Sequence, residues 1–178
     1  MGREISTEFV PRLIKIKREK WPKGWAPFPY DFDVGFGYSI VSQDFKDIVE
    51  AHDRDVHQFI PITLEDTRGM PIEKEYYWFA PRNRVFALNP DKVQGEVRYF
   101  SPDKPGWVNP HKDRLPAMVH GVVSDKMTLS FHADRIGDRD LFCDGEVPGE
   151  IFISDRLRSA FADAGLIGLT SSGPHPVR

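Results

Sequence analysis

Residues 151–169 constrain the fold most, because they read as a strand, a capped helix and a stop within one short stretch. Residues 151–153 are apolar and favour a β-strand. Ser154 is a good N-cap, since its hydroxyl can accept a hydrogen bond from an unpaired amide of the first helical turn. Gly165 predicts a left-handed helix stop, with a last strand at 166–169. The apolar residues of the helix recur at helical spacing at Leu157, Ala160, Phe161 and Ala164.

A second segment, near the other end of the chain, has the same layout. Residues 37–42 alternate as a strand does and lead into Ser42, and Asp44 then lies where the helix dipole favours a negative charge. Phe45, Ile48 and Val49 form the apolar stripe of this helix. The two strand-cap-helix units suggest an internal duplication, although junctions of this kind are common. The chain has no fixed period that would indicate a repeat array.

The rest of the chain predicts mostly strands. Residues 57–64 and 75–79 read as a hairpin around the turn at 65–69, and residues 13–17 as an edge strand guarded by lysines. Residues 84–88 form a further short apolar segment. Strands are expected at residues 118–123, 127–131 and 141–143, with 118–123 and 127–131 forming a hairpin around 124–126. The four prolines within residues 101–116 predict a long loop. With only two convincing helices, we expect an α+β fold: a mostly antiparallel or mixed sheet, two strand-cap-helix units and long loops.

The length of 178 residues predicts one domain. We expect a single α+β domain over residues 1–170, which begins with a basic strand segment at 1–24 and is followed by a flexible tail at 171–178. The basic segment carries a net charge of +4, which leaves −7 on the remaining residues. An acidic body of this kind can attract a basic partner. The composition therefore does not favour a nucleic acid as partner.

Apolar content of 40% and charged content of 29% are typical of a soluble globular protein. No apolar run approaches the roughly 20 residues that span a bilayer, so we expect no membrane partner. The N-terminus shows no apolar stretch of the secretory kind. The single cysteine, Cys143, excludes a disulfide within the chain and suits a reducing compartment. Together these features predict a cytoplasmic protein.

Candidate catalytic groups are few. Cys143 has no base near it in sequence, and its simplest interpretation is a small core residue. His52 and His57 do not share a helical face. The pairs His132–Asp134 and His111–Asp113 lack the third ligand that a metal site needs. We therefore predict no metal, no cofactor and no enzymatic activity. The alternative is a small hydrolase or transferase that uses Cys143 or a His–Asp pair.

Two further segments are candidates for partner binding. Asp134, Asp138, Asp140 and Asp144 form an acidic run whose spacing does not fit a calcium loop. We interpret the run as a solvated connection, with contact to a basic partner as the alternative. Residues 21–30 are rich in proline and aromatic residues, which indicates either a loop packed on the core or an exposed binding loop. Under the second interpretation, the partner-binding residues are Trp25, Phe28 and Tyr30.

Four segments, in this order and spacing, resemble an immunity-protein family of bacterial polymorphic toxin systems. They are Ile40-Val41-Ser42 with its helix; His57-Gln58-Phe59-Ile60-Pro61-Ile62; Tyr76-Tyr77 through Asn83-Arg84-Val85-Phe86-Ala87-Leu88; and Ile153-Ser154-Asp155-Arg156-Leu157 through Ala164-Gly165-Leu166-Ile167-Gly168-Leu169. This family is the eleventh in the usual numbering and was first catalogued as a domain of unknown function. The resemblance covers about residues 30–170. The chain departs from the pattern where residues 170–172 replace an expected aromatic residue, and the segment 21–30 lies outside it.

The resemblance implies a cytoplasmic protein with a role in bacterial competition. Such a protein binds a cognate toxin domain and neutralises it by stoichiometric occlusion. The acidic body suits a basic toxin. The family supplies no binding residues that could be assigned to positions of this chain.

Overall fold

A computed structural model describes residues 4–16, 30–35, 38–94, 97–99, 106–108, 121–122, 128–147 and 149–169. The chain divides into two compact units. The N-terminal unit contains Gly2–Arg82 and Ser154–Leu169, and the central unit contains Asn83–Ile153. The expectation of one domain over residues 1–170 stays a prediction, and residues 171–178 lie outside the described part of the chain.

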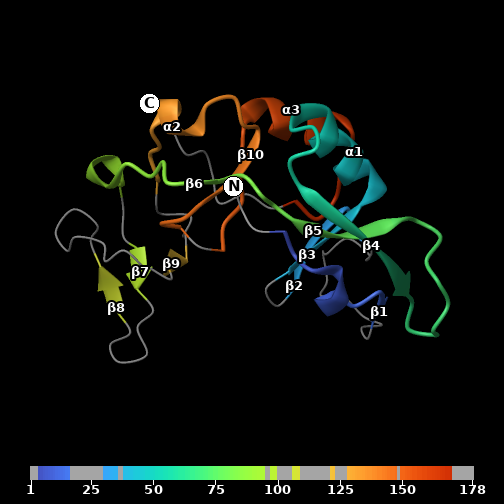
Figure 1. The fold of residues 1–178 in the computed structure, drawn as a ribbon. Coiled ribbons are helices and arrows are strands. Elements are labelled where there is room, and N and C mark those ends of the chain that lie inside the picture. The colour runs from blue at the N-terminus through green and yellow to red at the C-terminus, as the bar shows by residue number, and fades with distance from the viewer. Residues whose placement is uncertain are drawn as a thin grey trace. The chain divides into compact units, whose positions relative to one another are not determined.

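The N-terminal unit is built on a five-stranded mixed sheet (Figure 1). Its strands follow the order β1 (Leu13–Lys15), β4 (Gln58–Glu65), β5 (Tyr76–Ala80), β3 (Tyr38–Ser42) and β2 (Phe32–Gly35). β1 runs parallel to β4, and the other neighbours are antiparallel. The predicted hairpin of β4 and β5 and the predicted edge strand at β1 are therefore confirmed. A short 3-10 helix, Thr7–Phe9, precedes β1.

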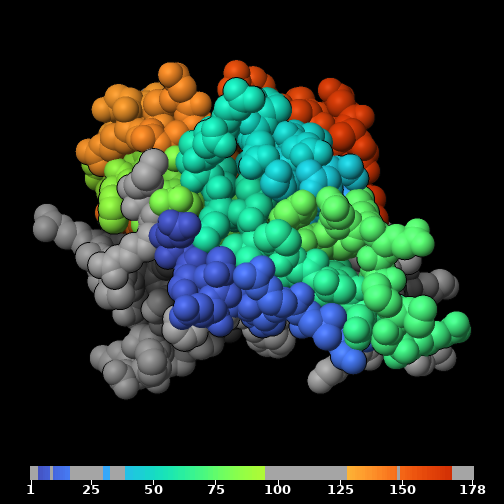
Figure 2. Space-filling view, turned by 45° about the vertical axis from the view of Figure 1, so that its right-hand side comes forward, coloured from blue at the N-terminus to red at the C-terminus, as the bar shows by residue number. Residues whose placement is uncertain are grey.

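One face of this sheet buries a hydrophobic core made mainly of aliphatic side chains. In β4, Ile60, Ile62 and Leu64 are buried, whereas the alternate residues Pro61 and Thr63 are exposed. This follows from the period of two in a strand, which sends successive side chains to opposite faces. The remaining members of this core are Val10, Ile40 and Tyr76, with Ile14, Ile72 and Trp78 packed against them. Figure 2 shows the N-terminal segment in blue lying against residues of β4, as their pairing requires.

The opposite face carries two helices, α1 (Gln43–His52) and α3 (Asp155–Asp163) (Figure 1). Both predicted caps are confirmed, because Ser42 Oγ accepts from Phe45 N at 3.3 Å and Ser154 Oγ accepts from Leu157 N at 3.0 Å. The rings of Phe45 and Phe161 stack with centroids 4.9 Å apart, which joins the two helices. The strand-cap-helix interpretation is thus correct for both segments.

The end of α3 has the predicted stop. Gly165 adopts a φ of +67°, and its N–H donates to Ala162 O while Leu166 N–H donates to Phe161 O. These two bonds are those of a Schellman motif, which satisfies carbonyl groups that the helix itself leaves free. The predicted last strand at 166–169 is wrong, because these residues form no strand. They instead form a short connection in which Asp31 N donates to Ile167 O at 2.9 Å.

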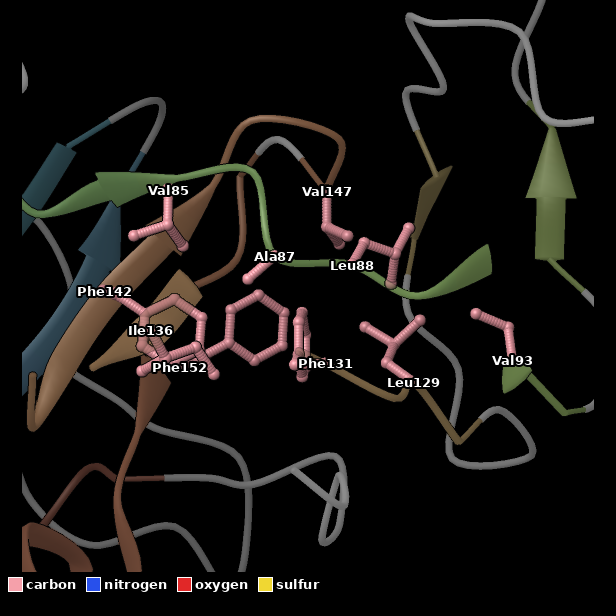
Figure 3. Packing of buried hydrophobic residues seen from close by; sticks show 10 residues of the cluster. All are labelled: Val85, Ala87, Leu88, Val93, Leu129, Phe131, Ile136, Phe142, Val147 and Phe152. Atoms are coloured by element: carbon pink, nitrogen blue, oxygen red, sulfur yellow. The ribbon is translucent and has the colours of Figure 1, made fainter. Parts of the chain in front are cut away.

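The central unit contains two three-stranded sheets. The first has the order β11 (Phe152–Ile153), β10 (Leu141–Asp144) and β6 (Arg84–Val85), and the second the order β8 (Gly106–Val108), β7 (Val97–Tyr99) and β9 (Gly121–Val122). Figure 3 shows the core beside the first sheet, where the rings of Phe131, Phe142 and Phe152 contact one another with centroids 4.8–5.6 Å apart. Val85, Ala87, Leu88, Val93, Leu129, Ile136 and Val147 complete this core.

Three sequence predictions in the central unit need correction. Within the described residues of the predicted hairpin of 118–123 with 127–131, the partners differ from those expected: β9 pairs with β7, while Thr128 and Phe131 form bridges to Gln94 and Leu88. The expected loop at 101–116 contains β8. A third, short α-helix, α2 (Ala133–Ile136), joins the two that the sequence predicts, and Pro90–Lys92 form a 3-10 turn. The fold class, α+β with mixed sheets, is nevertheless the one predicted.

Candidate functional site

The helices cover only part of their face of the five-stranded sheet. On this face Val41 of β3 and Phe79 of β5 are buried, and the ring of Phe79 meets that of Phe45 of α1 edge to face. On β1 and β4, at one edge of the sheet, side chains of the same face reach solvent. These residues are Pro61 and Thr63 of β4, which are exposed, and Leu13 of β1, which is 46% exposed and pairs with Thr63. We call Leu13, Pro61 and Thr63, together with the half-buried Phe59 and Tyr77 beside them, the open shelf.

Aromatic rings form the inner border of the open shelf. Phe59 and Tyr77 are half-buried, and their rings meet edge to face with centroids 6.3 Å apart. Phe59 also stacks on the buried ring of Phe79 at 5.1 Å. Lys46 of α1 lies over both border rings, with its Nζ 5.7 Å from the centroid of Phe59 and 5.6 Å from that of Tyr77. The rings are therefore held by packing below and by a cation above.

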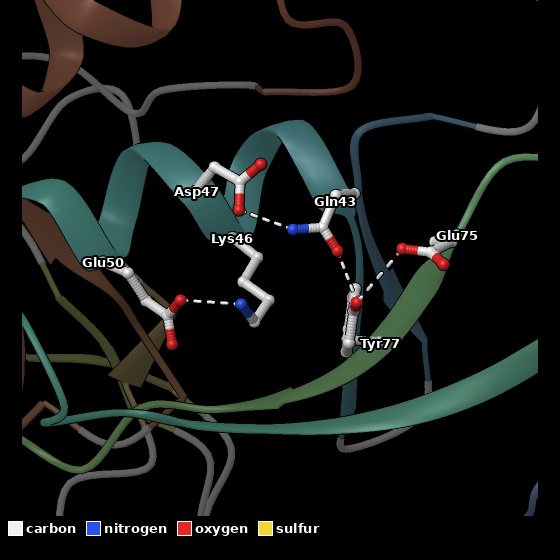
Figure 4. A network of polar contacts seen from close by, with 6 residues as sticks. All are labelled: Gln43, Lys46, Asp47, Glu50, Glu75 and Tyr77. Atoms are coloured by element: carbon white, nitrogen blue, oxygen red, sulfur yellow. Dashed lines mark hydrogen bonds and ion pairs between the residues drawn. The ribbon is translucent and has the colours of Figure 1, made fainter.

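A polar network on α1 and β5 holds the border in place (Figure 4). The Tyr77 hydroxyl donates to Gln43 Oε1 and lies 3.4 Å from Glu75 Oε2. Gln43 Nε2 donates to Asp47 Oδ1 one helical turn further along. Lys46 Nζ donates to Glu50 Oε2 at 2.6 Å. We call these six residues, Gln43, Lys46, Asp47, Glu50, Glu75 and Tyr77, the rim of the shelf. Each of their side chains contacts another side chain of the network, so the rim is ordered before another protein binds.

The protonation states of the rim follow from these contacts. The hydrogen bond to Glu50 raises the pKa of Lys46, against the effect of partial burial. Partial burial and the nearby Glu75 carboxylate raise the pKa of Tyr77. At neutral pH the amine is therefore charged and the phenol is neutral. The carboxylates of Asp47, Glu50 and Glu75 outnumber this single ammonium group in the network, which leaves the rim acidic.

A second charged cluster ties the sheet to the end of the N-terminal unit. Lys74 Nζ lies 2.6 Å from Asp31 Oδ1 and 2.8 Å from Asp44 Oδ2. The other oxygen of the buried Asp31 carboxylate accepts from Ile167 N at 2.9 Å. Burial by itself raises the pKa of Asp31, but the hydrogen bonds from Lys74, Ile167 and Ser42 outweigh it and lower the pKa below its ordinary value. This cluster serves the architecture of the unit.

His57 is buried beside Asp53, just before β4 begins. Its Nδ1 accepts from the backbone N–H of Arg82 at 3.2 Å, so its ring proton sits on Nε2, which lies 3.3 Å from Asp53 Oδ2. Burial lowers the pKa of His57, although Asp53 acts in the opposite direction. The two ring nitrogens therefore both serve as structural hydrogen-bonding groups. Within the described residues, no three His, Cys, Asp or Glu side chains gather as metal ligands would.

Cys143 is half-buried in β10 of the central unit. Burial raises the pKa of its thiol to about 11. The charged groups that act on this thiol are Arg84 and Asp144. Because the thiolate is the nucleophilic form, a thiol with this pKa is in its unreactive form at pH 7. Of the predicted His–Asp pairs, His111 and Asp113 lie outside the described residues, while His132 and Asp134 lie at the start of α2.

The interpretation of the acidic run as a solvated connection is wrong for half of its members. Asp134 and Asp138 are exposed, but Asp140 and Asp144 are buried. Asp144 Oδ2 accepts from the backbone N–H groups of Ala87 at 2.7 Å and Leu88 at 3.1 Å, and its Oδ1 accepts from Glu146 N at 2.8 Å. A carboxylate with three such donors replaces a missing strand partner for the segment after β6. The run is therefore not one continuous acidic surface.

The predicted partner-binding residues are only partly described. Trp25 and Phe28 lie outside the described residues. Tyr30 is buried, and its Cβ would lie 2.6 Å from a Cβ added at Gly168. Its side chain thus belongs to the packing of the N-terminal unit. The assignment of residues 21–30 as an aromatic binding loop stays a prediction.

The open shelf was not predicted from the sequence. The signal for it lies in β4, where Ile60, Ile62 and Leu64 alternate with the less apolar pair Pro61 and Thr63. That alternation predicts one buried and one accessible face. It does not reveal how far the two helices extend over the accessible face.

In the part of the chain that the structure describes, every helix is too short or too polar to cross a bilayer.

Comparison with known proteins identifies the family. Residues 11–171, nearly the whole chain, match the Immunity protein family (Imm11). The search of curated proteins finds no match. The family match includes both strand-cap-helix segments, the five strands of the N-terminal unit and the central unit. It also agrees with the resemblance seen in the sequence. The chain therefore belongs to the Imm11 immunity protein family.

Proposed function

We propose that this protein neutralises a cognate toxin domain by binding it in a one-to-one complex, without catalysis. The match of residues 11–171 to an immunity family carries this proposal. The polar groups that the sequence offered for catalysis support it. Burial raises the pKa of the Cys143 thiol to about 11, and both ring nitrogens of His57 are hydrogen-bonded, one to Asp53 and one to a backbone N–H.

The protein itself acts in the cytoplasm under this proposal, as part of a polymorphic toxin system used in bacterial competition. We further propose that the toxin is basic. This follows from the net charge of −7 on residues 25–178, which raises the encounter rate with a cationic partner. A non-catalytic inhibitor must hold its target tightly, at about −12 kcal/mol or beyond. An interface of that strength typically buries on the order of 1,600 Å².

Co-expression is the first experiment. The toxin domain encoded beside this protein is expressed in a sensitive bacterium with and without the protein, and colony survival is counted. Survival should be restored by the wild type and lost with Phe45→Asp, which places a charge among the buried rings at the α1–α3 contact. Equal killing in the presence of folded wild type would refute the proposal.

Titration separates occlusion from enzymatic inactivation. Residual toxin activity should fall linearly with added protein and reach zero at one equivalent. Longer incubation with half an equivalent should produce no further loss, because each bound molecule stays bound. Progressive loss of activity at half an equivalent would instead show turnover.

A further inference from the structure

We infer that the open shelf is the surface that meets the toxin, and that its occupant is a cationic protein surface. This inference rests on the proposed function and specifies which surface of the protein binds the toxin. The shelf lies on the part of the sheet face formed by β1, β4 and the adjoining end of β5. Leu13, Pro61 and Thr63 are exposed on this face, and Phe59 and Tyr77 are half-buried.

The strand pairing makes the shelf continuous. Pro61 lies opposite Tyr77 across β4 and β5, and Thr63 lies beside Leu13 across β4 and β1. Partners in register point to the same side of a sheet, so these side chains form adjacent rows. The Thr63 N–H donates to Arg12 O, on the side of β4 that faces β1. The nitrogen of Pro61, two residues earlier, points to the same side but carries no hydrogen to donate. The proline thus stands where β4 has no strand partner, and it blocks extension of the sheet there.

The rim is prepared for binding. Tyr77 is held by Gln43, Lys46 is held by Glu50, and the two rings of the border contact each other. Side chains already fixed lose little conformational entropy when a partner arrives, which leaves more of the contact energy for affinity. Tyrosine is also among the residues that most often dominate interface energies.

Charge selects the class of partner. The Lys46 ammonium is matched by Glu50, so Asp47 and Glu75 remain as excess negative charge beside the rings. At the outer end of the shelf, Lys15 lies 3.0 Å from Glu65 and the neighbouring Arg12 is exposed, so the excess negative charge is confined to the inner border. A rim of this sign repels phosphates and anionic lipid headgroups and attracts lysine and arginine side chains. The apolar floor beneath it fits the stems of those side chains.

Arginine substitutions on the shelf test the inference. Thr63→Arg and Leu13→Arg each place a cation where the partner is cationic, and we expect each to weaken binding of the toxin domain at least 100-fold in calorimetric titration. Ala162→Arg is the matched control. It makes the same charge change in the same unit, at an exposed position of α3 off the shelf, and should change the dissociation constant less than threefold. Circular dichroism confirms that each variant is folded.

Neutralising the rim tests the charge argument separately. The double variant Asp47→Asn with Glu75→Gln should slow association about tenfold at low salt and flatten its dependence on ionic strength, with little change in the dissociation rate. Asp134→Asn with Asp138→Asn removes two exposed carboxylates from the central unit and should leave the association rate unchanged.

The outcomes separate this inference from the proposed function. Wild type that fails to bind the toxin domain refutes the proposed function itself. Wild type that binds tightly, with Thr63→Arg and Leu13→Arg binding equally well, overturns the shelf alone. Loss of binding in Trp25→Ala with Phe28→Ala, but not in the shelf variants, would move the site to the aromatic segment. A wild-type dimer that Thr63→Arg dissociates in sedimentation would make the shelf a self-association surface and likewise overturn the inference.

Discussion

At the scale of single residues, buried polar side chains hold segments that regular structure does not. Asp144 is the clearest case, since three backbone N–H groups donate to it and its side chain is almost fully buried. The segment after β6 thereby satisfies amides that would otherwise be unpaired. The sequence shows only an aspartate before Gly145, a common turn pair, and does not reveal this role.

Replacing Asp144 should be costly. We expect Asp144→Ala to lower the free energy of unfolding by about 3 kcal/mol, because two buried N–H groups and one partly buried N–H group lose a charged acceptor. Urea denaturation monitored by circular dichroism measures the change. Asp138→Ala, at an exposed position four residues after the start of the same acidic run, should change stability by no more than about 0.5 kcal/mol. A similar small effect at Asp144 would contradict its assignment as a structural acceptor.

His57 should make stability depend on pH. Burial lowers its pKa below the ordinary value of 6.5, so the unfolded chain takes up this proton at a higher pH than the folded chain does. The stability that neutral His57 contributes is complete above about pH 6.5 and is lost as the pH falls toward the folded-state pKa. Unfolding free energies measured from about pH 7.5 to pH 5 should decline in the wild type and decline less in His57→Gln.

At the scale of elements, the two capped helices are the most local part of the fold. Ser42 and Ser154 act through hydrogen bonds that span three residues, and the stripes of α1 and α3 recur every three or four residues. Such signals lie within a short window of sequence, so both helices were predictable. The pairing of 128–131 with 88–94 has no comparable local signal.

The connection after α3 offers a matched pair of glycines. Gly165 and Gly168 both have positive φ, +67° and +91°, but only Gly168 lacks room, since a Cβ there would lie 2.4 Å from Phe32 O. Gly165→Ala should cost about 1 kcal/mol, through backbone strain alone. Gly168→Ala should cost at least about 2 kcal/mol more, because it also forces the Asp31–Ile167 pairing apart. Equal losses in thermal or urea unfolding would contradict this reading of the connection.

At the scale of the whole molecule, the chain leaves the N-terminal unit and returns to it. It enters the central unit after Arg82 and comes back at Ser154, which directly follows β11. The returning helix α3 supplies Leu157, which is fully buried, and Phe161, which stacks on Phe45. The core of the N-terminal unit is therefore completed only by residues that follow the central unit in the chain.

This chain path predicts cooperative unfolding. We expect a single calorimetric transition whose calorimetric and van't Hoff enthalpies agree, because α3 joins the central unit through the one cap residue, Ser154. This is also what the expectation of one domain over residues 1–170 requires. Two resolved transitions, or a calorimetric enthalpy well above the van't Hoff value, would show two domains that unfold independently.

The sequence by itself determined the α+β class, both capped helices, the stop of α3 at Gly165, and the hairpin of β4 and β5. It did so because caps, turns and hydrophobic periods act between residues a few positions apart. Its resemblance to an immunity family is confirmed by the match over residues 11–171. Only the tertiary structure decided that β1 runs parallel to β4, that Asp144 is buried, and that two helices leave part of a sheet face open. These features depend on contacts between distant segments, and each is set by which surfaces remain to be buried once the local elements have formed.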